Sequence, residues 1–454
     1  MKKVLNNSKI ARRIIYIFIL FFSSASIYWA DSYTIMCQNL AALDKLFKGE
    51  FFQCNFTWGV ICQIFLSVFD LPIYFVNKCL GINVYTSFFI KLLAKLDLIG
   101  FIFITGLFIS KILGLFHCSE EEKEAGLLMT ISSTFAFVTC CIIGQVDIIG
   151  VMFSAIALYY LIKEDNIKFF LFFCIAVQFK YFPLFYFIPI ILYKEKNLMK
   201  AGIKIGVPVI ICYILNLPFK SANNEVLSNN IGAEILENLT KTKIPIMGNE
   251  VPLVFLVFGA ICFWAYVKKY DAEKAKYYYV YYGFMGMVSI LTLYKLQGYR
   301  IIYLTPFIVL LFFINKENRK QRLLLEMSGT GGVTLGIALF NYWFFDFYNM
   351  RGNLIDFILP INKFECIGQE YIYRLVIQDQ YYSLWLLLYA VFIIWVGYVL
   401  ITHYPEKIIH TKTDEDENVI KMMDIRMVIS FFVANSTITL YIMCIIRNII
   451  GKLL

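Results

Sequence analysis

The order of apolar and polar positions along the chain predicts a series of membrane-spanning helices. A helix needs about 20 apolar residues to cross the hydrocarbon core of a bilayer. Apolar stretches that reach or approach this length recur along the whole chain, separated by short polar segments. We predict spans at 14–30, 84–110, 125–143, 148–162, 169–179, 184–193, 201–217, 251–267, 277–294, 301–315, 323–345, 382–402 and 427–446.

The stretch from 169 to 193 allows two interpretations. Its two halves are each too short to cross a bilayer fully, so they form either a proline-broken hairpin or one kinked helix. Lys and Arg are retained on the cytoplasmic side of short loops. If the stretch counts as two spans, the segments assigned to the cytoplasm hold 25 of the 41 Lys and Arg residues. This charge distribution favours the hairpin.

The predicted topology leaves three long external segments, at 31–83, 218–250 and 346–381. The first contains the amphipathic stretches "QNLAALDKLF" and "WGVICQIFLSVF", which we expect to lie flat in the outer interface. The N-terminal "MKKVLNNSKIARRIIYIFIL" has no small-residue cleavage site after it, so we interpret it as part of an uncleaved first helix. We expect residues 1–454 to form a single integral-membrane domain.

The composition agrees with a multi-pass membrane protein. Hydrophobic residues make up 60% of the chain and charged residues 16%, with a mean hydropathy of +0.70. An ordinary soluble domain has about 25% charged residues. The formal net charge of +9 is explained by the basic clusters between apolar runs, so we expect no nucleic-acid partner. A transmembrane helical bundle of about 12–13 spans, all-α in class, follows from this pattern.

Several common site types are excluded on the external side. His117, His403 and His410 all fall on predicted cytoplasmic segments, which excludes an external histidine base or a histidine-ligated zinc site. The sequence contains no Walker loop and no glycine-rich dinucleotide motif. The remaining external chemistry consists of carboxylates, lysines and arginines.

Charged residues gather at the external ends of the predicted spans. Asp31 ends the first apolar run, Asp147 lies in "CCIIGQVDIIGVMF", Lys180 lies in "VQFKYFPLFYFIPIIL", and Lys295 and Arg300 lie in "LYKLQGYRIIYLTPF". Ionisable groups inside a membrane cost at least ~2.5 kcal/mol each, so they tend to be functional or paired. Basic groups beside carboxylates suit chemistry on an anionic lipid, because the cations hold a phosphate while a carboxylate accepts a proton.

Each of these residues has an alternative role. Asp31 can flank a helix end, and Asp147 can serve a tight turn. Lys180 and Arg300 can extend toward phospholipid headgroups. A structural ion pair between Asp147 and Lys180 is a further alternative. We interpret Lys91, Lys95 and Asp97 as one polar face of the second span.

Two segments of the chain resemble a known family. The end of the first helix, "WADSY", followed by "LAALDKLFKGEFF", resembles the opening of the membrane-embedded glycosyltransferases of the C-type fold. The region from "GQVDIIG" to "KYFPLFYFIP" is similar to the mannosyltransferase branch that uses polyprenyl-phosphate mannose. The resemblance covers residues 14–220 and, loosely, 297–306. The residues that carry the second part are Gly144, Gln145, Asp147, Lys180, Pro183 and Pro189.

The resemblance implies a C-type glycosyltransferase with a family-like core at 84–220 and a variable C-terminal part at 221–454. Such an enzyme transfers a hexose, here mannose-like, from a polyprenyl-phosphate donor to an acceptor hydroxyl with inversion. Asp31 would be the catalytic base, and Lys180, Arg300 and Lys295 would bind the donor phosphate. Other residues expected at the substrate are Tyr33, Gln145, Asp147, Tyr181, Gln297 and Tyr299. Asp31 stands alone where some branches have paired acids, so we expect no metal and no cofactor.

The expected partners are the lipid-linked donor, a glycan or lipid acceptor and membrane lipids. We expect a bacterial cytoplasmic membrane with the site facing outside. The sequons at Asn55, Asn238 and Asn435 leave an endoplasmic-reticulum membrane with a lumenal site as the alternative. Two other functions stay open: a transporter or flippase of lipid-linked sugars, and a polysaccharide polymerase or ligase. A transporter predicts matching broken helices in two halves of the chain, and the second half has no counterpart to the breaks near Pro183 and Pro189. A polymerase or ligase usually has Arg and His in a large late external loop, whereas the loop 346–381 contains Arg351 and Arg374 but no histidine.

Overall fold

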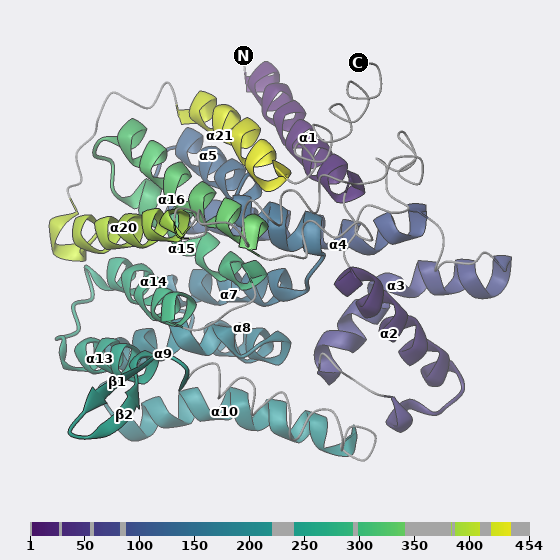
Figure 1. The fold of residues 1–454 in the computed structure, drawn as a ribbon, viewed down its shortest axis with the longest axis horizontal. Helices are drawn as coiled ribbons and strands as arrows, with labels where there is room; N and C mark the ends of the chain where they lie inside the picture. The colour runs from purple at the N-terminus through teal and green to yellow at the C-terminus, as the bar shows by residue number, and fades with distance from the viewer. Residues whose placement is uncertain are drawn as a thin grey trace.

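The computed structural model describes residues 2–26, 30–54, 59–81, 88–219, 240–293, 298–340, 383, 386–408 and 419–436. Within these residues the protein is helical apart from one short β-hairpin (Figure 1). The all-α class predicted from the sequence is therefore confirmed for the part of the chain that the structure describes.

The helices follow the predicted apolar stretches closely. The N-terminal part contains α1 (Lys2–Ser26), α2 (Ala30–Phe47), η1 (Phe51–Gln53), α3 (Val60–Leu80), α4 (Phe88–Leu115), α5 (Glu120–Ile131), α6 (Thr134–Ala136), the π-helix η2 (Phe137–Ile143), α7 (Asp147–Ile162), α8 (Asn166–Phe179), α9 (Phe182–Lys194), α10 (Leu198–Asn216) and η3 (Leu217–Phe219). The C-terminal part contains β1 (Lys243–Ile246), β2 (Asn249–Pro252), α13 (Leu253–Val267), α14 (Ala275–Leu293), η5 (Gly298–Leu304), α15 (Thr305–Ile314), α16 (Arg319–Phe340), α20 (Leu387–Thr402), η10 (Pro405–Lys407) and α21 (Val419–Ala434).

Four helical segments of the described chain are long and apolar enough to cross a membrane, namely Val60–Leu80, Leu92–Leu115, Glu120–Ile143 and Leu198–Phe219. Six shorter apolar helices accompany them. These segments indicate a membrane protein. The first of them is α3, which lies in the segment 31–83 where we expected amphipathic helices flat on the surface. Asp70 and Lys78 are the charged residues of this helix, so its composition also fits a span.

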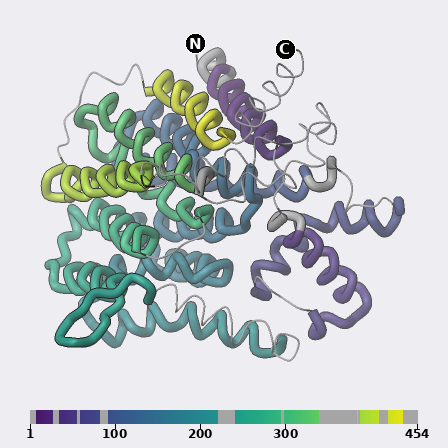
Figure 2. The backbone as a smooth tube through the Cα atoms, viewed as in Figure 1, coloured from purple at the N-terminus to yellow at the C-terminus, as the bar shows by residue number. Residues whose placement is uncertain are grey.

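The core of the bundle is formed by α4, α5 and α7. Every residue from Glu124 to Ile143 is buried, and α7 packs against both α4 and α8. Figure 1 shows α7, α8 and α10 stacked one below another, with α2 and α3 at the right-hand side of this stack. The tube view in Figure 2 shows the same arrangement and follows α1 and α21 side by side along the upper edge.

Helices α8 and α9 form an antiparallel pair, so the hairpin interpretation of residues 169–193 is confirmed. Lys194 at the end of α9 donates a hydrogen bond of 2.8 Å to Asn166 at the start of α8. Between these ends the rings of Phe173 and Phe187 lie 4.8 Å apart. The chain reverses at Lys180, whose backbone is extended, and Pro183 occupies the first turn of α9, where proline needs no amide hydrogen bond.

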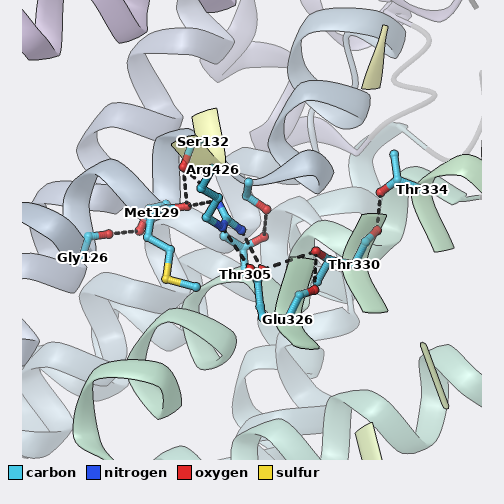
Figure 3. Close-up of polar contacts among 10 residues, drawn as sticks. Gly126, Met129, Ser132, Thr305, Glu326, Thr330, Thr334 and Arg426 are labelled. Carbon is cyan, nitrogen blue, oxygen red and sulfur yellow. Dashed lines mark hydrogen bonds and ion pairs between the residues drawn. The ribbon is translucent and has the colours of Figure 1, made fainter. Parts of the chain in front are cut away.

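Buried ion pairs connect helices that are far apart in sequence. Arg426 of α21 forms two hydrogen bonds with Glu326 of α16, of 3.0 and 2.7 Å, and also donates to Ser132 and to the carbonyl of Met129 (Figure 3). Arg426 and Glu326 are each 2% exposed. Because both charges are desolvated, each depends on the other for compensation. The network therefore fixes α5, α16 and α21 relative to one another.

The residues after α20 are held to α14 by an exposed carboxylate. Glu406 of η10 interacts with Lys274, Tyr278 and Lys268. The hydrogen bond from Lys274 contributes most, followed by the one from Tyr278. Together with Lys268 they lower the pKa of Glu406 from its usual 4.5 to about 2.

Candidate functional site

A wide helical turn places Asp147 at the start of α7. The π-helix η2 ends at Gly144, which adopts the left-handed conformation with φ of 73° that glycine accommodates without strain. The amide of Gln145 then donates to the carbonyl of Thr139 at 2.8 Å. Asp147 begins α7, where the helix dipole favours a negative charge. The geometry of this turn thus directs a carboxylate into the core of the bundle.

Asp147 is completely buried. Neither of its carboxylate oxygens has a hydrogen-bond partner among the described residues. Asp147 therefore makes no hydrogen bond to Lys180, and the structural ion pair between the two residues stays an alternative. A buried carboxylate without hydrogen bonds costs several kcal/mol, so this position is expensive to maintain for packing alone.

Lys180 approaches the same region from the reversal between α8 and α9. The thiol of Cys62, near the start of α3, lies within electrostatic range of both Lys180 and Asp147. The neighbouring Gly59 lies against α8, since a Cβ atom at Gly59 would be 3.7 Å from the carbonyl oxygen of Gln178. The start of α3 thus brings these two opposite charges to one place.

Arg300 and Tyr303 complete the arrangement from η5. The guanidinium carbon of Arg300 lies 5.3 Å from the centre of the Phe182 ring, and that ring stacks on Tyr303 at 5.1 Å. Tyr303 packs against α7, because a Cβ atom at Gly150 would lie 2.8 Å from its hydroxyl oxygen. Both Asp147 and Arg300 lie within electrostatic range of the Tyr303 hydroxyl. Its hydroxyl group is buried and has no hydrogen-bond partner within the described ranges.

We call Asp147, Lys180, Arg300 and Tyr303 the charged cluster. Its members come from α7, the α8–α9 reversal and η5, so residues separated by 153 positions in the chain meet in the bundle. Two fixed cations can hold a phosphate, and a phenol hydroxyl can donate a further hydrogen bond to it. The carboxylate can accept a proton or a hydroxyl hydrogen bond.

No protein-family model, no curated protein and no solved structure matches this chain.

Three further predicted residues take different positions around the charged cluster. Gln145 is completely buried and lies two residues before Asp147. Tyr299 is 4% exposed, and its carbonyl accepts a hydrogen bond of 2.7 Å from Thr139. Tyr181 is 55% exposed, and its hydroxyl lies 3.7 Å from the sulfur of Cys212 on α10. Gln145 and Tyr299 thus belong to the core beside the cluster, whereas Tyr181 faces α10.

The remaining predicted residues stay predictions. Asp31 is the second residue of α2, after a first helix that ends at Ser26. The side chains of Asp31 and Tyr33 lie outside the described residues, as do Lys295 and Gln297. The catalytic role of Asp31 therefore rests on the sequence.

Sequence analysis missed a second group of buried polar residues, on α2, α3 and α4. Gln63, Ser67 and Asp70 share one face of α3 and are 0, 6 and 7% exposed. The amide of Asn39 on α2 donates to Asp70 at 2.7 Å. Asp97 of α4 lies within electrostatic range of Asp70. The spacing of four and then three residues in "QIFLSVFD" is the signal that would have revealed this face.

Lys95, which we interpreted as part of one polar face of the second span, lies in the interior of the bundle. It is 1% exposed, and its ammonium group donates to the carbonyls of Cys141 and Ile142 at 2.8 and 3.2 Å. A π-helix leaves carbonyls without the partners that an α-helix would give them. Lys95 therefore stabilises the wide turn that positions Asp147.

Proposed function

We propose that this protein is a membrane-embedded glycosyltransferase that takes a hexose from a polyprenyl-phosphate donor. The observation that supports the proposal most strongly is the charged cluster. It combines two cations with a buried carboxylate, next to helices that have the length and apolar composition of membrane spans. A lipid-linked phosphate needs this combination of an apolar surrounding for its tail and cations for its head.

In the proposed reaction Lys180 and Arg300 hold the donor phosphate. Negative charge increases on that phosphate as its bond to the sugar breaks, and fixed cations stabilise a developing charge more than the ground state. The acceptor hydroxyl attacks the anomeric carbon from the opposite side, which inverts that centre. Asp31 accepts the hydroxyl proton, a role that contributes typically 10²–10⁴-fold to the rate. Asp147, whose carboxylate oxygens make no hydrogen bond within the described residues, can bind a sugar hydroxyl.

Binding of polyprenyl phosphate to purified full-length protein tests the role of the cations. A hydrogen bond to a charged group contributes about 1.5–3 kcal/mol. Lys180→Gln and Arg300→Gln should therefore each weaken binding about 10-fold or more. Lys194→Gln is the matched control, because Lys194 lies at the other end of α9 and binds Asn166. Equal affinity in all four proteins would refute the phosphate assignment.

Turnover tests the enzymatic part of the proposal. Wild-type protein incubated with polyprenyl-phosphate mannose and a glycan acceptor should release polyprenyl phosphate. Asp31→Asn should release at least 10²-fold less while retaining donor affinity, since it removes only the base. A transporter of lipid-linked sugars would bind the donor without releasing polyprenyl phosphate, so binding without any release would favour that function instead.

A further inference from the structure

The buried polar face of α3 continues from the charged cluster toward α2 and α4. We call Gln63, Ser67 and Asp70 the polar stripe. Cys62, whose thiol lies within electrostatic range of Asp147 and Lys180, directly precedes its first residue. Seven residues of α-helix cover about 10 Å, which is the length of one to two sugar rings. The stripe thus begins beside the proposed phosphate position and extends away from it.

Most polar atoms of the stripe have no hydrogen-bond partner in the described part of the chain. This holds for the amide oxygen and nitrogen of Gln63 and for the hydroxyl of Ser67. Asn39 uses its amide nitrogen on Asp70, and its amide oxygen is buried and without a partner among the described residues. Buried polar groups are normally hydrogen-bonded, and each exception costs about 1–3 kcal/mol. A ligand with several hydroxyl groups would satisfy all of them.

The donor and acceptor types at the stripe fit hydroxyl groups better than a metal ion. Gln63 and Asn39 offer amide oxygens, Ser67 can donate and accept, and Asp70 with Asp97 supplies carboxylates. A hydroxyl both donates and accepts, so it can bond to every one of these groups. Among the described residues no three His, Cys, Asp or Glu side chains are placed to hold a metal ion.

We propose that the polar stripe, with Asn39 and Asp97, binds the hydroxyl groups of a hexose. The inference rests on the proposed function, because it places the sugar next to the phosphate held by the charged cluster. The hexose is either the one carried by the donor or the terminal one of the acceptor. Both present the same hydroxyl chemistry to the stripe.

Three probes separate these sources on purified full-length protein: polyprenyl phosphate, polyprenyl-phosphate mannose and methyl α-mannoside. The first quantity is the affinity for polyprenyl-phosphate mannose divided by the affinity for polyprenyl phosphate, which isolates the contribution of the sugar. The second quantity is the affinity for methyl α-mannoside. Ser67→Ala and Asp70→Asn remove one hydroxyl contact each with little change in volume. Thr105→Val is the matched control, because Thr105 is equally buried but already donates to the carbonyl of Phe101 at 2.8 Å.

If the stripe binds the donor sugar, the ratio should exceed one in wild type and fall about 10-fold in both stripe variants. If it binds the acceptor sugar, the ratio should stay constant while methyl α-mannoside affinity falls by a similar factor. Either loss supports the proposal, provided that Thr105→Val matches wild type. The proposal is overturned if both quantities are unchanged in the stripe variants, or if wild type neither prefers the sugar-bearing lipid nor binds methyl α-mannoside.

This outcome is independent of the phosphate test. Lys180→Gln should weaken binding of both lipids in parallel and leave their ratio unchanged. A failure of the cation assignment would therefore appear in absolute lipid affinity, whereas a failure of the stripe assignment appears in the ratio and in methyl α-mannoside binding. Should Asp70→Asn lower the yield of folded protein, Ser67→Ala measures the same quantities with the removal of a single oxygen atom.

Discussion

The buried pair Arg426–Glu326 allows a quantitative prediction of stability. Arg426→Met removes the two charged hydrogen bonds to Glu326 and the donor to Ser132 (Figure 3). Among the described residues, Glu326 would then keep only a long contact of 3.4 Å from the hydroxyl of Thr330. A buried carboxylate left in this state costs about 3–5 kcal/mol. We expect the free energy of unfolding of Arg426→Met to fall by that amount.

A double-mutant cycle separates the lost pairing from the lost packing. Glu326→Leu combined with Arg426→Met replaces both charges by apolar side chains, so no uncompensated charge is left. We expect the double variant to be only about 1–2 kcal/mol less stable than wild type, since the carbonyl of Met129 and the hydroxyl of Ser132 lose a donor. The coupling energy between the two sites should therefore exceed about 2 kcal/mol.

Denaturant titration of the purified protein in detergent micelles measures these energies. Arg12→Met is the control, because the Arg12–Asp424 pair joins α1 to the same helix α21 but is exposed by 30 and 43%. An exposed pair contributes about 0–1 kcal/mol. The reasoning fails if Arg426→Met costs no more than Arg12→Met, or if the effects of Arg426→Met and Glu326→Leu simply add.

Two further predictions concern packing and pH. Gly286→Ala should lower the free energy of unfolding by about 1–3 kcal/mol, because the new methyl group meets a backbone carbonyl of α9. Gly259→Ala is the control and should not lower it, because Gly259 lies on the open side of α13. Equal free energies of unfolding for the two variants would contradict the packing argument. Glu406 has a pKa lowered to about 2, so its interactions stabilise the folded protein above pH 4.5 and are lost as the pH falls toward 2. The Tm of Glu406→Gln should therefore lie below that of wild type at pH 7, and the two Tm values should converge near pH 2. A constant Tm difference across this pH range would contradict the assignment.

The positions of the helices were accessible from the sequence because they depend on local apolar length. The predicted span 148–162 corresponds to α7 (Asp147–Ile162), and the predicted hairpin at 169–193 corresponds to α8 and α9. Asp147, Lys180 and Arg300 each follow the same end of a predicted span, which is why the sequence grouped them, and their shared role as a substrate site stays a prediction. A charge inside or at the edge of an apolar segment was the informative signal in all three.

Contacts that depend on packing could not be predicted in this way. Glu326 and Arg426 are 100 positions apart, and nothing in either helix specifies the partner of its charge. The group of Lys91, Lys95 and Asp97 suggested one polar face, yet the partner of Lys95 is a π-turn that leaves no periodic mark in the sequence. The polar stripe was missed because α3 was interpreted as a surface helix, where polar positions need no internal partner.

The π-helix from Phe137 to Ile143 also determines how the chain tolerates changes in length. A turn of this kind contains more residues than an α-helical turn, so η2 holds surplus chain relative to the helices on either side. Deleting one residue within it can be absorbed by tightening to the ordinary winding, which leaves Asp147 in its orientation. The same deletion after Asp147 would rotate the rest of α7 by about 100°, because each α-helical residue turns the helix by that angle.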